Sequence, residues 1–384
     1  MQFLLHSQIK SKKSKQTLPS QTDIELVYNH YIQDGNNSAV TGGIGTEKLT
    51  VYSSGINLKS TFGKNTLSFK VGADVISSAS TDNIDFVVSS ASILDARIYI
   101  NANYSRLIKK RNLTLFGGLG FSIESDYLSL SHNLGFIKND KQDLRSFSAQ
   151  IQVYNDDLRW WGLDFANYKE NKLIYPKELR TQEWFTQHKR NSYNLKMSYT
   201  QVLNKYNTMG LFSELTYQQG LLSTPYHRVY MSDTPNIVVE NLPQERYKLS
   251  LGLKLNSFVS GRLIFKNSLS SYIDNFGIFA LTLENEVAIK VNPFFTLYPN
   301  FRIYNQKASK YFAPYKAHSN KELYYTSDYD LSSFQTFTFG IGFKYVFQKT
   351  FFKSVLLRYS FYYRSNNLSA HIASIIIQTS FFKK

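Results

Sequence analysis

The sequence predicts an all-β fold, a transmembrane antiparallel up-and-down β-barrel of about 16 strands with long extracellular loops. Three observations support this prediction. Apolar and polar residues alternate along many segments, the long connections all fall on one side, and the charges within the segments share one face.

The segment from Arg246 to Asn256 shows the alternation most clearly. Its apolar side chains occupy every second position, where a strand would place them on one face: Tyr247, Leu249, Leu251, Leu253 and Leu255. A tilted strand of roughly 9–11 residues crosses a bilayer, so the segment is long enough to span one. A soluble β-sandwich strand alternates in the same way, and only repetition along the chain favours the barrel.

Turn residues separate the repeats of this pattern. Gly63-Lys64-Asn65 predicts a tight hairpin, and Asp34 to Asn37 ends the first segment by turn chemistry. The expected strands cover residues 23–33, 48–62, 66–76, 95–107, 113–123, 127–136, 147–154, 191–203, 209–217, 247–255, 262–271, 279–290, 295–304, 337–347, 355–363 and 373–381.

The connections sort by length. If the first strand runs outward, every long connection lies at the same end of the barrel: residues 34–46, 77–94, 155–189, 218–244 and 305–334. The other end has only short turns, which is typical of outer-membrane barrels and unexpected for a sandwich. The insert at 155–189 holds all three tryptophans, which we expect to serve as packing anchors of that loop.

Composition limits the alternatives. The 384 residues include 28 Tyr and 29 Phe, no Cys, and no apolar run of about 18 residues that would form a transmembrane helix. The net charge is +16, but Lys and Arg are spread through the chain, so we expect no nucleic-acid binding. Residues 23–384 are expected to form a single barrel domain. Residues 1–22 form a polar lead without a signal-peptide core, which indicates an upstream start, a processed or truncated chain, or an incorrect barrel prediction.

Charged residues of the expected strands fall opposite the apolar row, where they avoid the cost of facing lipid. The basic members predicted to line the lumen are Lys59, Lys70, Arg97, Lys196, Lys248, Lys254, Arg262, Lys266, Arg302, Lys344 and Arg358. They outnumber the acidic ones, so an open lumen should prefer anions. The alternative is a lumen plugged by loops, in which these residues pair with loop carboxylates.

Several loop sequences resemble those of a known protein family. Residues 33–47, 78–85, 220–230 and 304–331 resemble a family of Bacteroidota proteins known as a domain of unknown function. The resemblance implies an outer-membrane β-barrel. It also implies gene neighbours that include a small lipoprotein, a thioredoxin-fold protein and a flavin transferase, and hence a redox-linked envelope system, but it implies no site residues.

Loop residues offer few chemical motifs. Asp82, Asp85, Asp328 and Asp330 are candidate Ca²⁺ ligands, although their spacing lacks the calcium-loop signature and ordinary Asx turns are the favoured explanation. His227, beside Arg228 and near Asp233, has neither a nucleophile motif nor a recurring metal spacing, so we expect a structural role.

The sequence therefore favours a non-enzymatic outer-membrane barrel that acts as a pore, or as a scaffold for a small lipoprotein or another envelope protein, with membrane lipids around it. A barrel enzyme acting on lipid or surface substrates is the alternative, but no Ser-His-Asp set supports it. A soluble β-sandwich binding module is the third possibility. No cofactor other than Ca²⁺ is expected.

Overall fold

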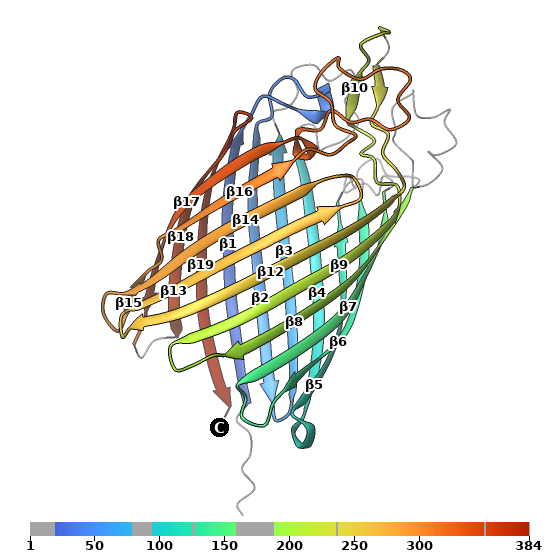
Figure 1. The fold of residues 1–384 in the computed structure, drawn as a ribbon. Coiled ribbons are helices and arrows are strands. Elements are labelled where there is room, and N and C mark those ends of the chain that lie inside the picture. Colours follow the sequence, from blue (N-terminus) through green and yellow to red (C-terminus); the bar gives the residue numbers. More distant parts are fainter. Residues whose placement is uncertain are drawn as a thin grey trace, which may run out of the picture.

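An antiparallel sheet that closes on itself forms the body of the molecule (Figure 1). The structure is a computed structural model, and it describes residues 20–78, 94–124, 127–158, 188–235, 237–348 and 351–383. Within these ranges, no helix has the length and apolar character needed to span a membrane. The strands of the sheet are β1 (Ser20–Asp34), β2 (Leu49–Phe62), β3 (Asn65–Ser78), β4 (Leu94–Ile108), β5 (Leu113–Ile123), β6 (Leu128–Asn139), β7 (Arg145–Asp157), β8 (Lys189–Val202), β9 (Asn207–Gly220), β12 (Glu245–Ser260), β13 (Leu263–Asp274), β14 (Phe279–Lys290), β15 (Phe295–Leu297), β16 (Asn300–Lys307), β17 (Phe334–Val346), β18 (Phe352–Arg364) and β19 (Leu368–Lys383).

Closure of the sheet confirms the predicted barrel. β1 pairs antiparallel with both β2 and β19, so the first and last strands join. The sheet has 17 strand segments in the described ranges, but β15 and β16 both pair with β14 and β17 and form one interrupted strand, which gives 16. The interruption falls at Tyr298 and Pro299, where proline lacks the N–H that a central ladder requires. A closed ring excludes the β-sandwich.

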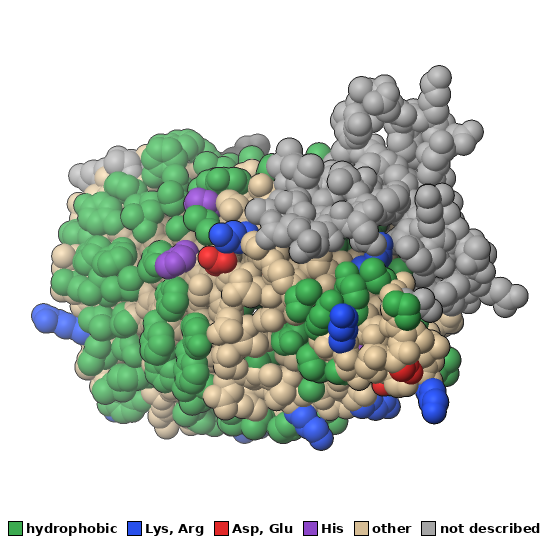
Figure 2. Space-filling view, turned by 90° about the horizontal axis from the view of Figure 1, so that it is seen from above, with side chains coloured by type: hydrophobic (Ala, Val, Ile, Leu, Met, Phe, Trp, Pro, Cys, Tyr) green, Lys and Arg blue, Asp and Glu red, His purple; other side chains and the backbone are tan. Residues whose placement is uncertain are grey.

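The outer face of the barrel is apolar. Leu119 and Leu134 are 70% and 71% exposed, and Phe339 is 61% exposed, far more than a soluble protein leaves large hydrophobic side chains. Seen from above, hydrophobic side chains cover a broad part of the visible surface and charged ones are scattered (Figure 2). A bilayer removes this surface from water, so the sequence pattern and the structure agree on a membrane-spanning wall.

The opposite face lines an interior crossed by polar contacts. Arg358 of β18 donates to Glu286 of β14 at 2.8 Å, although β16 and β17 lie between these strands in the sheet. Such a bond can form only across the inside of the curved wall. The residues that share a register with Glu286 and Arg358 therefore face the lumen.

The two ends of the barrel differ as predicted. At one end the described connections are short turns, such as Gly63 and Lys64 between β2 and β3. At the other end lie the longer connections, residues 35–48, 221–244 and 308–333. Strand β1 begins at Ser20, earlier than the expected Asp23, because its ladder to β19 continues to the Ser20–Lys383 pair.

The long connections fold together into what we call the cap, the described residues of 35–48, 221–244 and 308–333. It contains η1 (Ala39–Thr41), η6 (Tyr329–Leu331) and a small hairpin of β10 (Arg228–Tyr230) and β11 (Ile237–Val239), visible at the top of Figure 1. Val229, Met231 and Val239 are 0%, 4% and 3% exposed. Much of the buried hydrophobic core of this protein thus lies in the cap, above the polar lumen.

Candidate functional site

The lumen holds all but one of the basic residues proposed to line it. By register they share the inward face of the strands: Lys59, Lys70, Arg97, Lys196, Lys248, Lys254, Lys266, Arg302, Lys344 and Arg358. Arg262 is the exception, because β12 ends at Ser260 and β13 begins at Leu263, which places Arg262 in the exposed turn between them. That turn lies at the end opposite the cap.

Carboxylates neutralise part of this basic lining. Glu286 accepts from Lys266 at 2.7 Å and from Arg358 at 2.8 Å, and Lys196 lies 3.6 Å from Glu214. These pairs tie neighbouring and more distant strands together across the interior. Glu214 and Glu286 belong to the wall itself, whereas the plugged-lumen alternative expected carboxylates from the loops.

Aromatic rings contact further cations of the lining, of which Arg97 also lies 3.5 Å from the Glu124 carboxylate. Lys70 and Arg97 both lie over the ring of Tyr99, at 5.2 and 5.5 Å from its centroid. The ring fits there because Gly72 has no side chain. A Cβ at this glycine would stand 2.4 Å from the Tyr99 hydroxyl. Lys254 lies over Phe212 in the same way, at 5.1 Å. Such cation–π contacts fix the side chains without cancelling their charge.

A second polar cluster lies in the cap and joins two of its loops. His227 Nδ1 is 3.4 Å from Glu240 Oε2 and 3.8 Å from Asp328 Oδ2. The Glu240 side chain is 2% exposed, while those of His227 and Asp328 are each 20% exposed. The Thr224 amide donates to Glu240 Oε1 at 2.7 Å, and the Thr326 hydroxyl donates to Oε2 at 2.5 Å, so the buried carboxylate is held in one orientation.

Burial and charge shift the titration of this cluster. Burial opposes a charge on His227, but the nearby carboxylates, Glu240 above all, raise its pKa to about 9. Burial raises the pKa of Asp328 to about 6, against the pull of His227 and with the help of Asp330. The carboxylates therefore favour the charged form of the imidazole, which in turn compensates them.

Two of the four predicted Ca²⁺ ligands lie in the part of the chain that the structure describes. The Asp330 carboxylate accepts from Arg364, and the Asp330 amide donates to Asp328 Oδ1 at 2.9 Å. Asp82 and Asp85 lie outside the described residues, as do the tryptophans of the 155–189 insert.

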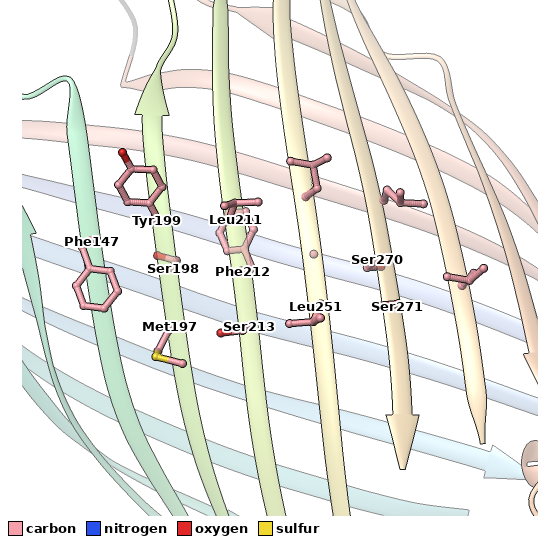
Figure 3. Close-up of a pocket in the computed structure, with 14 residues that line it drawn as sticks. Phe147, Met197, Ser198, Tyr199, Leu211, Phe212, Ser213, Leu251, Ser270 and Ser271 are labelled. Carbon is pink, nitrogen blue, oxygen red and sulfur yellow. The ribbon is translucent and has the colours of Figure 1, made fainter. Parts of the chain in front are cut away.

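A groove of about 640 Å³ lies on the outer wall (Figure 3). Phe147, Tyr199 and Leu211 belong to its outward row by register, and the small side chain of Ser213 contributes to the hollow. Because this face is the apolar one, the groove is a place for lipid chains and lies outside the lumen.

Sequence reasoning missed the cap cluster. His227 stood out but was given a structural role beside Asp233, which instead accepts from Ser319 and Asn320. Glu240 carried no signal, since it lies 13 residues from His227 and 88 from Asp328 in sequence. Only the pairing of β10 with β11, which puts Arg228 opposite Val239, brings the neighbours His227 and Glu240 together.

Comparisons with known proteins identify a family and a general likeness. The family model described as "Protein of unknown function (DUF3570)" matches residues 87–378. No curated protein matches the chain in sequence.

Solved structures that resemble the chain include OpdK of Pseudomonas aeruginosa with vanillate (8% identity, TM-score 0.41, 95% of this chain and 99% of that one). A bacterial polysaccharide outer membrane secretin aligns with 9% identity and a TM-score of 0.49, over 94% of this chain and 98% of that one. The TodX monoaromatic hydrocarbon channel aligns with 11% identity and a TM-score of 0.41, over 95% of this chain and 90% of that one. Identities this low carry no information about ligands.

Proposed function

We propose that this chain, which belongs to the DUF3570 family, is a channel of the bacterial outer membrane with a preference for small anions. The observation that carries the proposal is the separation of the two faces of the wall. An apolar outer surface matches a bilayer, and a charged, hydrogen-bonded inner surface matches water and hydrophilic solutes. Sixteen strands give a barrel wide enough for an aqueous path unless loops fill it.

The sign of the preference follows from the inner wall. Lys70 and Lys254 lie against aromatic rings, contacts that leave their charges in place. Positive charges on a low-dielectric wall attract counter-ions and concentrate them along the path.

Planar-bilayer recordings of the purified protein under a salt gradient test the proposal. We expect a reversal potential on the anion-favouring side, and a shift toward cations in the double variant Lys70→Glu, Lys254→Glu. Arg262→Glu is the matched control, since that side chain lies in the exposed turn outside the lumen. A cation-favouring potential in the native protein contradicts the anion preference.

Absence of any current would instead favour the scaffold function, in which the capped barrel holds a small lipoprotein or another envelope protein. Co-purification of such a partner from native membranes, at a fixed ratio to the barrel, is the result expected in that case. The native protein and the Lys70→Glu, Lys254→Glu variant would then retain it equally.

A further inference from the structure

We propose that His227, Glu240 and Asp328 form a binding site for a divalent transition-metal cation, with Zn²⁺ as the best match, and that the ion joins two loops of the cap. The site is independent of ion passage through the lumen. It rests on the kinds of ligand atom, on their separations and on the way each side chain is held.

The three ligand atoms lie close enough together to converge on one ion. His227 Nδ1 lies 3.4 Å from Glu240 Oε2, a long hydrogen bond, and 3.8 Å from Asp328 Oδ2, and the three ligand atoms all lie within 4.8 Å of one another. Ligands at about 2.0–2.2 Å from a tetrahedral ion lie roughly 3.3–3.6 Å apart. The 3.4 Å separation meets this range, and the longer ones close to it when the side chains draw in around the ion.

The donor set selects the class of cation. One imidazole nitrogen and two carboxylate oxygens suit Zn²⁺ and its neighbours, whereas Ca²⁺ takes six to eight oxygen ligands. The chain has no cysteine, so a thiolate site is impossible. Three protein ligands leave a fourth position for water, and the 20% exposure of His227 and Asp328 leaves the cluster accessible to solvent.

Each carboxylate is held by groups that are not ligands. The Thr224 amide and the Thr326 hydroxyl fix Glu240 from both oxygens. The Asp330 amide donates a hydrogen bond to Asp328 Oδ1, and Oδ2 remains on the side of His227. Outer contacts of this kind orient the ligands of metal sites, and they are already formed in the chain alone.

The ion would have a structural consequence. His227 and Glu240 belong to the loop 221–244, and Asp328 belongs to the loop 308–333. A shared ion would therefore add a cross-link to two loops that already meet through hydrogen bonds such as Ser232 N to His318 O at 2.8 Å and through the Tyr230–Tyr315 ring contact. Metal removal should loosen the cap and leave the barrel wall intact.

Calorimetric titration of the full chain in detergent, stripped with chelator and then given ZnCl₂, tests the site. We expect one Zn²⁺ per chain, with the affinity at least 10-fold weaker in both His227→Asn and Asp328→Asn. Asp330→Asn is the matched control: it alters a carboxylate of the same loop that pairs with Arg364, and it leaves the backbone amide that orients Asp328. Heat-modifiable migration of every variant shows that the barrel has folded.

X-ray absorption at the zinc edge supplies a second readout. A single imidazole in a nitrogen and oxygen shell supports the proposal, and its disappearance in His227→Asn assigns the ligand. The proposal is overturned if the stripped chain binds no stoichiometric Zn²⁺, or if His227→Asn binds it as the native chain does. Binding of Ca²⁺ alone, weakened equally by Asp328→Asn and Asp330→Asn, would overturn it in favour of an oxygen-only site.

Discussion

At the scale of the residue, the structure shows side chains whose surroundings work against their ordinary ionisation. Glu47 enters the cap just before β2, and burial raises its pKa to about 7. The Arg364 guanidinium opposes this shift in pKa, while Asp330 and Asp328 reinforce it. Burial of a carboxyl group therefore outweighs one nearby cation here.

This shift predicts a pH dependence of stability. Between the ordinary pKa of 4.5 and about 7, the folded chain binds more protons at Glu47 than the unfolded chain does, so stability falls as pH rises through this window. Glu47→Gln removes the ionisation and should raise stability at pH 8 by about 1–3 kcal/mol relative to its effect at pH 5. Unfolding in urea, followed by fluorescence at both pH values, measures the difference. An equal effect of the substitution at pH 5 and pH 8 would show that Glu47 does not ionise as described.

At the scale of the element, strands and loops differ in how far sequence predicts them. Each strand can be predicted from the alternation of polar and apolar residues within about a dozen positions. The pattern is local because one face of the strand meets water and the other meets lipid. Arg262 shows the limit of this kind of prediction. Alternation alone does not distinguish a residue just outside a strand end from one inside the strand.

The cap could not be predicted because its contacts join distant positions. Thr326 and Glu240 are 86 residues apart, and Asn37 donates to the Asn366 carbonyl across 329 residues at 2.6 Å. No repeating pattern of neighbouring residues in the sequence marks such pairs. Of the three candidate metal ligands, the sequence analysis singled out His227 and Asp328, and Glu240 carried no signal.

Loop packing in the cap makes one glycine indispensable. Gly43 has a φ of +87°, and a Cβ there would lie 2.8 Å from the backbone oxygen of Ser327 in another cap loop. Gly43→Ala should therefore separate loop 35–48 from loop 308–333 and speed cleavage of the cap by protease at least several-fold. Limited proteolysis of the folded protein, with the barrel core monitored by its retained heat-modifiable band, measures this effect.

Gly63→Ala is the control for backbone strain. Its φ of +62° is also left-handed, but no atom lies within 4 Å of the added Cβ. Equal cleavage rates in Gly43→Ala and Gly63→Ala would show that strain alone, without the contact to Ser327, explains the result.

At the scale of the whole molecule, closure couples all the strands. The β1–β19 ladder pairs every residue from Ser20 to Asp34, so the ring offers no edge from which detergent can peel a strand. We expect the folded protein to be found in the membrane fraction and to migrate differently in detergent gels before and after boiling. A chain that is soluble and monomeric without detergent would contradict the membrane assignment.

Two neighbouring positions near the middle of β19 separate the lipid face from the lumen in a single experiment. Ile375 is 41% exposed on the outer face, whereas Ser374 faces inward opposite Arg358. A charge facing lipid costs ~2–4 kcal/mol at mid-membrane for basic residues and less for acidic ones, so Ile375→Asp should lower the fraction that refolds to the heat-modifiable form. Ser374→Asp should refold like the native chain, because the new carboxylate meets water and the Arg358 guanidinium. The reverse order of yields would mean that the two faces have been assigned the wrong way round, and with them the lumen on which the channel proposal depends.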